Sequence, residues 1–286
     1  MTITITTSNV NGIRAAKRKG IEQWAAKNTP DVWCMQEVRA PQNEIDPIFD
    51  EFGFEYATAG RIADQSGLDR MNEICRIKGR AGVGLLSALP VIDKRYGLPG
   101  LAEDVDSGRW IEADVKTPQG YTVTVVCVYV HAGNTDDPEK MKQKYRFLDT
   151  MLVRMGQLRD EAAHGGKQAV LCGDFNIAHT PLDIKNAKAN EKHAGFLPEE
   201  RAYVDKWLGE LEFVDVMRSL CGDIQGPYTW WSQRGHAFDN NVGWRIDYQF
   251  ATPELAETAR GFVIDKAPTY DLRWSDHAPL SITYDV

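Results

Sequence analysis

Hydrophobic and polar residues alternate along the chain with two different periods. Threonine and isoleucine alternate over residues 2–6, and a stretch rich in valine extends over residues 121–130. A period of two and an enrichment in β-branched residues are typical of β-strands. The same features predict further strands over residues 32–35, 82–87, 168–172, 245–251 and 279–284.

Longer segments carry apolar residues at the spacing of an amphipathic helix. Within residues 138–163, apolar side chains recur every three or four positions from Tyr145 to Leu158. Such spacing places them on one helical face, where they can pack against a sheet. Residues 14–27 and 198–211 are predicted helices for the same reason.

Strands and helices are interleaved from the first residues to the last. No linker rich in glycine, serine or proline divides the chain, and no repeat of fixed period is visible. This arrangement predicts an α/β fold in a single domain, residues 1–286. Residues 61–80 fit neither period and carry more basic than acidic side chains, so we expect a long surface loop there.

Composition and charge narrow the classes of protein. With 43% hydrophobic and 26% charged residues, the chain has enough apolar surface for a core, which excludes a disordered or collagen-like protein. The formal net charge of −8 argues against a protein that coats nucleic acid through overall basicity. A polyanionic partner must therefore meet a local basic patch.

The sequence also bears on location and on cysteine chemistry. No apolar run approaches the ~20 residues that cross a bilayer, and the first residues lack the features of a signal peptide. We therefore expect a cytoplasmic protein without a membrane partner. The five cysteines are odd in number and include no Cys-x-x-Cys pair, which favours buried thiols over a zinc site.

Polar side chains stand at the ends of most predicted strands. Loops at such ends commonly line the crevice in which an α/β fold binds its substrate. Each residue alone has an ordinary explanation as a turn, a helix cap or a core residue. The candidates are Asn9, Asn11, Gln36, Glu37, Tyr129, Asp174, Asn176, Asp247, Asp276 and His277.

Seven short strings place these candidates in a recognisable series. They are SNVNGIR (8–14), MQE (35–37), GVGLLS (82–87), GDFNIAH (173–179), LDI (182–184), WRID (244–247) and SDH (275–277). This series resembles the exonuclease III family of apurinic/apyrimidinic endonucleases within the endonuclease/exonuclease/phosphatase superfamily, and the resemblance covers residues 2–284. The resemblance implies a four-layered α/β sandwich, with two mixed β-sheets face to face and helices outside.

The resemblance implies a role for each candidate in phosphodiester hydrolysis. Glu37 would be the first ligand of Mg²⁺, with Mn²⁺ as a substitute, and Asn11 and Asp276 would lie nearby. Asp174 would orient or deprotonate the attacking water, and one or two metal ions would fit the pattern. Asn9 would hold Asp174, Asn176 and His277 would grip the phosphate, Asp247 would orient His277, and Tyr129 would contact the phosphate or the leaving group.

Other segments resemble the DNA-repair branch of the superfamily, namely residues 182–201, 229–231 and 242–247. The implied activity is cleavage of double-stranded DNA on the 5′ side of an abasic site, with 3′ to 5′ exonuclease activity and trimming of 3′ ends, by a monomer. The implied DNA-binding residues are Arg14, Arg80, Asn186, Asn190, Trp230 and Trp244, of which the two tryptophans would line the pocket for a flipped sugar.

Two other functions remain open from the sequence. A phosphomonoesterase or phospholipase of the same superfamily would share the catalytic residues but not the segment 182–201. A DNA-binding module without activity would lack at least one of the catalytic carboxylates, and all of them are present.

Overall fold

The computed structural model describes residues 1–51, 69–73, 79–101 and 107–286. The described strands are β1 (Thr2–Asn9), β2 (Val32–Gln36), β3 (Asp69–Glu73), β4 (Val83–Ser87), β5 (Val91–Tyr96), β6 (Trp110–Lys116), β7 (Thr122–Tyr129), β8 (Gln168–Asp174), β9 (Val214–Asp215), β10 (Trp230–Trp231), β11 (Gly243–Trp244), β12 (Asp247–Ala251), β13 (Ala259–Ile264) and β14 (Leu280–Asp285). The described helices are α1 (Ile13–Arg18), α2 (Ile21–Asn28), α3 (Gln42–Glu51), α4 (Pro138–Ala163), α5 (Ala187–Asn190), α6 (Pro198–Gly209), α7 (Val216–Cys221) and α8 (Pro253–Ala256), with 3₁₀ turns η3 (Pro181–Asp183) and η4 (Tyr270–Leu272).

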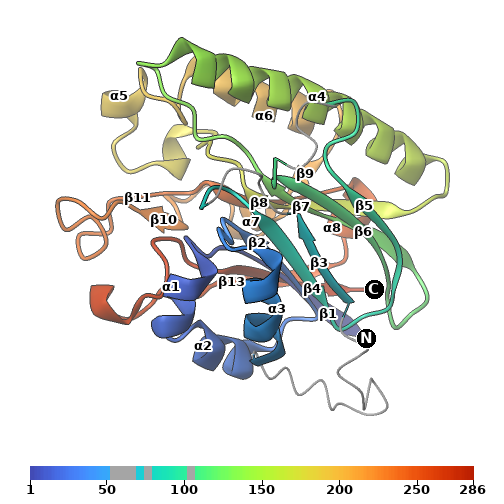
Figure 1. Ribbon diagram of the computed structural model, residues 1–286. Coiled ribbons are helices and arrows are strands. Elements are labelled where there is room, and N and C mark those ends of the chain that lie inside the picture. Colours follow the sequence, from blue (N-terminus) through green and yellow to red (C-terminus); the bar gives the residue numbers. More distant parts are fainter. Residues whose placement is uncertain (52–68, 74–78, 102–106) are drawn as a thin grey trace.

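Two six-stranded sheets form the centre of the molecule. The first has the order β13-β14-β1-β2-β4-β3 and the second the order β5-β6-β7-β8-β12-β9. Both are mixed, because β1 and β2 run parallel, as do β7 and β8, while their other described neighbours are antiparallel. Since β1 pairs with β14, the two ends of the chain lie side by side (Figure 1).

The alternation of side chains explains why the sheets are covered on both faces. In β7, Val123 and Val125 point into the core between the two sheets. Their neighbours Val126 and Val128 point the other way, into a second core beneath α4. A strand with apolar residues on both faces must be buried on both faces. The valine-rich pattern of this strand therefore reflects a central position in a layered fold.

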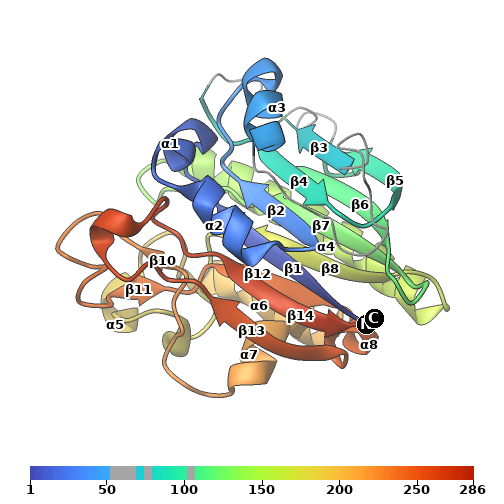
Figure 2. The same cartoon turned by 90° about the horizontal axis from the view of Figure 1, so that it is seen from below.

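Helices close the two outer faces of the sandwich (Figures 1 and 2). Met151, Met155 and Leu158 of α4 pack with Trp207 of α6 against the second sheet. On the opposite side, α1, α2 and α3 bury an apolar cluster that includes Trp33 of β2. The order helix, sheet, sheet, helix confirms the predicted four-layered α/β sandwich.

Two predicted elements need correction. The helix predicted over residues 14–27 is divided into α1 and α2, because Gly20 lies between them with φ of 97°, a backbone conformation that interrupts a right-handed helix. The loop predicted over residues 61–80 contains the strand β3, which pairs with β4. Residues 61–68 and 74–78 of that prediction lie outside the described residues.

The cysteines agree with the expectation of buried thiols. Cys34, Cys127 and Cys172 are buried free thiols, Cys221 is half-buried, and Cys75 lies outside the described residues. Among the helices that the structure describes, none has the length and apolar character to span a membrane.

The topology brings the polar strand ends to one edge. The parallel pairs β1–β2 and β7–β8 end at Asn9 and Gln36 and at Tyr129 and Asp174, which are partners in register. The antiparallel strand β12 begins at Asp247, directly opposite Asp174. Residues far apart in the chain therefore meet at this edge of the two sheets.

Candidate active site

A cavity of about 430 Å³ opens at the edge where these strands end. The predicted residues that line it are Asn11, Glu37, Tyr129, Asp174, Asn176, Asn190, Trp230, Trp244, Asp276 and His277. The structure thus brings together most of the residues that the sequence singled out. Asn9 and Asp247 are buried directly behind this lining.

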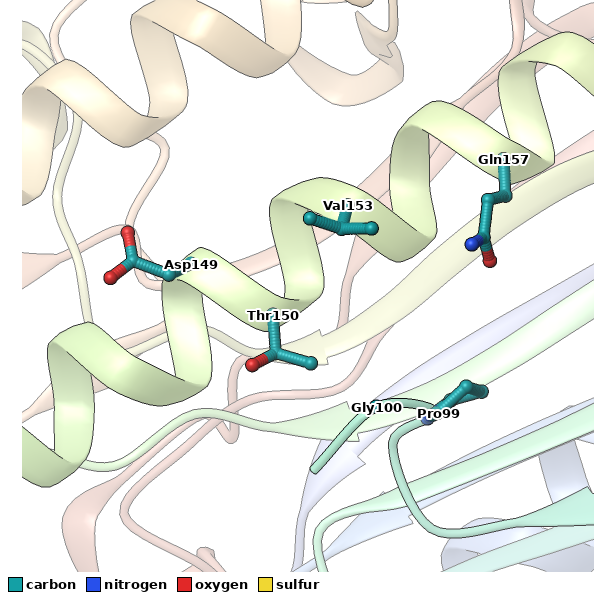
Figure 3. Close-up of a pocket in the computed structure, with 6 residues that line it drawn as sticks. All are labelled: Pro99, Gly100, Asp149, Thr150, Val153 and Gln157. Carbon is teal, nitrogen blue, oxygen red and sulfur yellow. The ribbon is translucent and has the colours of Figure 1, made fainter. Parts of the chain in front are cut away.

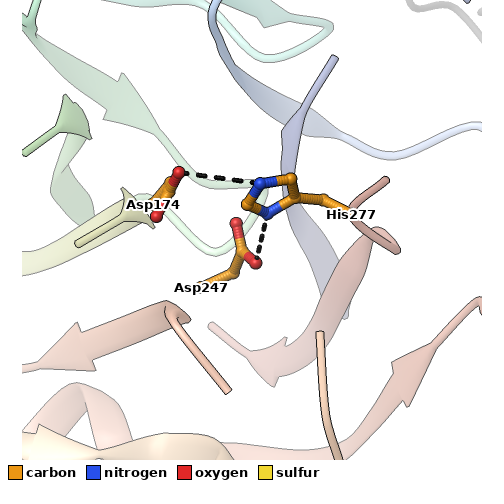
Figure 4. A group of neighbouring side chains, drawn as sticks. All are labelled: Asp174, Asp247 and His277. Carbon is orange, nitrogen blue, oxygen red and sulfur yellow. Dashed lines mark hydrogen bonds and ion pairs between the residues drawn. The ribbon is translucent and has the colours of Figure 1, made fainter. Parts of the chain in front are cut away.

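Asp174, His277 and Asp247 form a buried row of charged groups (Figure 4). His277 Nδ1 lies 2.9 Å from Asp247 Oδ2, and His277 Nε2 lies 3.8 Å from Asp174 Oδ2. The imidazole is held between two carboxylates, and its Nε2 edge faces Asp174. His277 therefore cannot rotate away from Asp174 without losing its bond to Asp247.

Burial and neighbouring charges shift the pKa values of this row. Burial raises the pKa of Asp174 to about 7, although the charge of His277 acts in the opposite direction. Burial alone would lower the pKa of His277, but the Asp247 and Asp174 carboxylates outweigh it and raise that pKa to about 9. Near neutral pH the protein thus holds a protonated imidazole beside a carboxylate that exchanges its proton readily.

Backbone and side-chain amides fix the orientation of the Asp174 carboxylate. Asn9 Nδ2 donates to Asp174 Oδ2 at 2.9 Å and to Glu37 Oε1 at 3.0 Å. The backbone N–H of Asn176 donates to Asp174 Oδ1 at 2.9 Å, and Asn176 Nδ2 donates to Asp174 Oδ2 at 3.3 Å. The predicted role of Asn9 as the residue that holds Asp174 fits this geometry.

The predicted metal ligands lie in the same cavity, close to this row of charged groups. Asn11 Nδ2 donates to Asp276 Oδ1 at 2.7 Å, and the Arg39 guanidinium bridges the Glu37 carboxylate and Asn11 Oδ1. Burial would raise the pKa of Asp276, but the charge of His277 and bonds from Asn11 and Trp230 lower it. A donor set of oxygen atoms that already attracts one cationic group fits a hard divalent cation.

A second group of possible ligands is less suited to a metal. Ligand atoms of Asp174, Asp247 and His277 lie within 4.8 Å of one another. However, His277 must be neutral to bind a metal, and the two carboxylates keep it protonated. The imidazolium already supplies the positive charge that these carboxylates need, so this group suits a metal less well than the oxygen atoms of Glu37, Asn11 and Asp276.

Four residues that line the cavity have a left-handed backbone. Asn11, Glu37, Arg39 and Asn176 have φ values of 47°, 54°, 53° and 50°. Asparagine adopts this conformation readily, but glutamate and arginine do so at a cost. Such strained residues gather at functional sites because the surrounding contacts over-determine them.

Tyr129 lines the cavity beside Glu37. Its hydroxyl donates to Glu37 Oε1 at 2.6 Å, and the Arg109 guanidinium lies 4.9 Å from the centre of its ring. Burial raises the pKa of Tyr129 to about 12, so the phenol stays protonated at neutral pH. Tyr129 can therefore donate a hydrogen bond to a substrate oxygen.

Two tryptophans form an aromatic wall beside the charged groups. Trp230 of β10 and Trp244 of β11 are partners across this two-stranded ribbon, with ring centres 6.0 Å apart at 88°. Trp230 Nε1 donates to Asp276 Oδ2 at 3.2 Å. The wall gives the cavity an apolar side of fixed shape next to its hydrolytic side.

Three predicted DNA-binding residues are outside the described lining. Arg14 is exposed and bonds to Glu44 Oε2 at 2.9 Å, which links α1 to α3. Arg80 is exposed just before β4, and Asn186 precedes α5. These residues could meet a substrate that extends beyond the cavity, but they do not shape it.

Several residues outside the predicted set hold members of that set in place through hydrogen bonds. Ser275 Oγ donates to the Asn9 carbonyl at 2.6 Å, and Thr229 Oγ1 accepts the Asp247 N–H at 3.1 Å. Both stand directly before a residue of the predicted set, Asp276 or Trp230, which is the signal that could have found them. Arg39 is also close in sequence to a predicted residue, because it follows Glu37 by two positions.

Another cavity, of about 370 Å³, lies between α4 and residues 99–100 (Figure 3). Its described lining includes Asp149, Thr150, Val153 and Gln157, and no residue of the candidate set. A single carboxylate among uncharged side chains offers no paired groups for catalysis. We therefore place the active site in the first cavity.

Comparison with known proteins agrees with this geometry. The endonuclease/exonuclease/phosphatase family matches residues 6–277. The exodeoxyribonuclease of Bacillus subtilis is 29% identical over 97% of this chain and 98% of its own.

Solved structures give the same picture. An AP endonuclease from Archaeoglobus fulgidus is 30% identical with a TM-score of 0.81, covering 99% of this chain and 100% of that one. A 3′ phosphatase from Neisseria bound to a product DNA hairpin is 26% identical with a TM-score of 0.78, at the same coverage. From the family match, the chain belongs to the endonuclease/exonuclease/phosphatase family.

Proposed function

We propose that the protein is a Mg²⁺-dependent DNA-repair nuclease that hydrolyses the phosphodiester on the 5′ side of an abasic site and also removes groups from 3′ ends. The proposal depends mainly on one observation. The charged residues Asp174 and His277, the oxygen donors and the aromatic wall line a single cavity. The names of the relatives support the choice of DNA as substrate. We further propose that residues 1–286 form a single catalytic domain that acts as a monomer in the cytoplasm.

The charged row supplies the hydrolytic chemistry. Asp174, whose pKa is raised to about 7, orients a water molecule and accepts its proton as the oxygen attacks phosphorus. The bond between phosphorus and the 3′ oxygen breaks, and the departing oxygen takes a proton from solvent, which leaves a 3′ hydroxyl and a 5′ phosphate. Protonated His277 and the Asn176 amide donate to the phosphoryl oxygens, where negative charge builds up.

The predicted metal ligands and Tyr129 would stabilise the negative charge on the phosphate and on the departing oxygen. Glu37, Asn11 and Asp276 would hold Mg²⁺, which when bound supplies a positive charge beside the phosphate. Tyr129, protonated at neutral pH, donates a hydrogen bond to the phosphate or to the departing oxygen. Glu37 and Asn11 now contact the Arg39 guanidinium, and a bound metal would replace it as their cationic partner.

The aromatic wall would select the damaged nucleotide. Trp230 and Trp244 line the cavity and would pack against a flipped sugar that has lost its base, and their rings would compete for the space that a base needs. Asn190 lines the same space, and Asn186, Arg14 and Arg80 would contact the DNA backbone outside it.

A second activity, removal of a 3′ phosphate from DNA, is supported by the relative from Neisseria. The same water, oriented by Asp174, would attack a terminal phosphate instead of a diester. By contrast, action on soluble phosphomonoesters or phospholipids has no support from the relatives described above. The aromatic wall also favours a nucleic-acid end over a free phosphate ester.

A panel of substrates tests the proposal. We would incubate the protein with a duplex that has one internal abasic analogue, a duplex with a recessed 3′ hydroxyl, a duplex with a 3′ phosphate and a soluble phosphomonoester, each with Mg²⁺ or with EDTA. The proposal predicts Mg²⁺-dependent incision at the abasic analogue and slower processing of the 3′ ends. Turnover of the phosphomonoester with no cleavage of any duplex would overturn it.

A further inference from the structure

Lys144 is a charged side chain buried in the wall of the active-site cavity. Its side chain is 0% exposed, and it extends from α4 toward the loops behind that wall. Its Nζ lies 2.5 Å from Glu200 Oε1 and donates to the carbonyls of Asn176 at 2.9 Å and Ala132 at 3.2 Å. Burial of a lysine is costly unless its charge is paired and its donors are bonded. The Glu200 carboxylate pairs the charge, and the two carbonyls accept hydrogen bonds.

The three oxygen partners of Lys144 belong to three separate segments around the cavity. Ala132 follows β7 and Asn176 follows β8, and both line the cavity. Glu200 lies on α6, and its Oε2 accepts the N–H groups of Gly195 at 2.6 Å and Leu197 at 3.0 Å. Through Glu200 the lysine thus reaches the segment at residues 193–195, of which His193 and Ala194 line the cavity.

We propose that the buried Lys144–Glu200 pair is a positioning device that fixes Asn176 and the segment 193–195 around the substrate. The inference rests on the proposed function, because it assigns Asn176 to the reacting phosphate. It adds two residues that touch neither water nor substrate but determine where groups that do so are placed.

The path from Lys144 to the reacting groups is short. Asn176 adopts φ of 50°, and its N–H and Nδ2 both donate to Asp174. Lys144 holds the carbonyl of this same residue and so helps to keep the turn in this conformation. The Gly195 carbonyl in turn accepts the N–H of Ala178, which joins the second segment to the strand end. Loss of Lys144 would therefore displace Asn176 relative to Asp174.

The same helix offers a matched control. Arg154 of α4 donates through Nε and Nη2 to the buried carboxylate of Glu112 at 2.7 Å and 2.8 Å. This pair is ten residues further along α4, ~15 Å away at 1.5 Å per residue. It is also buried and charged, but neither residue lines the active-site cavity.

The test compares Lys144→Met with Arg154→Met. Steady-state kinetics on the abasic duplex would be measured well below the melting temperature of both variants, together with hydrogen exchange followed by mass spectrometry. We expect Lys144→Met to lower kcat by about 10²-fold, with KM changed by less than about threefold. Exchange should rise in segments 131–133, 175–178 and 193–197. Arg154→Met should keep kcat within about twofold and leave the exchange of those segments unchanged.

The outcomes separate this inference from the proposed function. Equal kcat values for the two variants, or unchanged exchange in the three segments of Lys144→Met, would overturn the positioning role. Failure of the wild type to cut any duplex would overturn the function, while the exchange data would still decide the positioning role. Should Lys144→Met fail to fold, the double variant Lys144→Met/Glu200→Gln removes both charges and carries the same predictions.

Discussion

At the scale of single residues, Asp174 and His277 occupy a buried space in which each depends on the charge of the other. The imidazole is protonated because two carboxylates surround it, and burial keeps the Asp174 pKa near neutral. Opposite charges at 3.8 Å, shielded from water, interact more strongly than they would at the surface. The protonation states needed for hydrolysis therefore coexist over a limited range of pH.

That range predicts a bell-shaped pH profile. Below about pH 7 Asp174 is protonated and cannot accept a proton from water, so kcat/KM on the abasic duplex should rise up to that pH. Above about pH 9 His277 loses its proton, so kcat/KM should fall. In the Asp247→Asn variant the alkaline limb of the pH profile should move to lower pH, because the Asp247 carboxylate contributes most to the raised pKa of His277. An alkaline limb that stays in place would contradict this account.

Removal of the Asp174 carboxylate should abolish most of the activity. An amide of the same shape cannot accept a proton from water, and general-base catalysis contributes about 10²–10⁴-fold. We expect kcat of Asp174→Asn to fall by at least about that factor in single-turnover assays. As a control, Asp93→Asn alters an exposed carboxylate on β5, paired with Arg95, and should leave kcat unchanged. Near-normal cleavage by Asp174→Asn would mean that another residue activates the water.

The sequence allowed residues at strand ends to be predicted but not the residues that support them. Asp174 follows an apolar run and His277 precedes another, but their roles followed from the resemblance of their strings to one family. Ser275 and Arg39 look like ordinary loop residues, and their contacts arise only when β1, β2 and the chain before β14 meet. Their roles depend on contacts between distant segments, which local pattern does not record.

At the scale of elements, the parallel neighbours β7 and β8 determine the spacing of Tyr129 and Asp174. A Cβ atom added at Gly173 would lie 1.9 Å from the carbonyl oxygen of Val128, which is part of the ladder between the two strands. Backbone atoms cannot yield to such a contact without separating the strands. Glycine at this position therefore allows β8 to approach β7 one residue before the catalytic carboxylate.

This close approach predicts a severe effect of Gly173→Ala. We expect the free energy of unfolding to fall by at least about 3 kcal/mol, measured by urea denaturation. The control is Gly209→Ala at the end of α6, where an added Cβ meets no atom within 4 Å. There alanine should change stability by no more than about 1 kcal/mol, in the stabilising direction. Equal stabilities of the two variants would contradict the argument.

Elements with uniform patterns were predictable, and those with buried charges were not. The valines of β7 indicate a strand that is buried on both faces. By contrast, β6 carries two acidic residues, Glu112 and Asp114, that are both fully buried. They pair with Arg154 of α4 and with Arg95 of β5. Ile111, Ala113 and Val115 alternate with these acidic residues, which is the pattern of a strand with one face in water. The burial of the acidic face depends on arginines from α4 and β5, so the sequence did not indicate it, and the predicted strands did not include β6 or its partner β5.

At the scale of the whole molecule, buried ion pairs join segments that the sheets alone do not connect. Arg245, between Trp244 and Asp247 in sequence, is fully buried and contacts both Asp183 and Asp215. Asp183 also accepts from Arg218 of α7. The aromatic wall and the partner of His277 are thereby anchored to the turn η3 and to α7.

The anchor at Asp183 makes stability depend on pH. Burial alone would raise its pKa, but Arg245 and Arg218 outweigh it and lower the pKa to about 2. Because this value is below that of the unfolded chain, the contribution is complete above about pH 4 and is lost as the pH falls through 2. Its size is about 2 kcal/mol.

Asp183→Asn tests this linkage. At neutral pH the variant should lose about 3–5 kcal/mol of unfolding free energy, because two arginines lose a buried partner. The difference from the wild type should shrink by about 2 kcal/mol between pH 6 and pH 2 in urea denaturation. A difference that is the same at both pH values would show that the Asp183 carboxylate is not ionised by its arginine partners.

The central claim is that a water molecule oriented by Asp174 attacks the phosphorus on the 5′ side of an abasic site. Mass spectrometry of the products formed in H₂¹⁸O with Mg²⁺, under single-turnover conditions, tests it most directly. We predict one ¹⁸O atom on the phosphate of the 5′ sugar-phosphate product and an unlabelled 3′ hydroxyl on the other fragment. An unlabelled product cut on the 3′ side of the sugar, as elimination would give, would contradict the account.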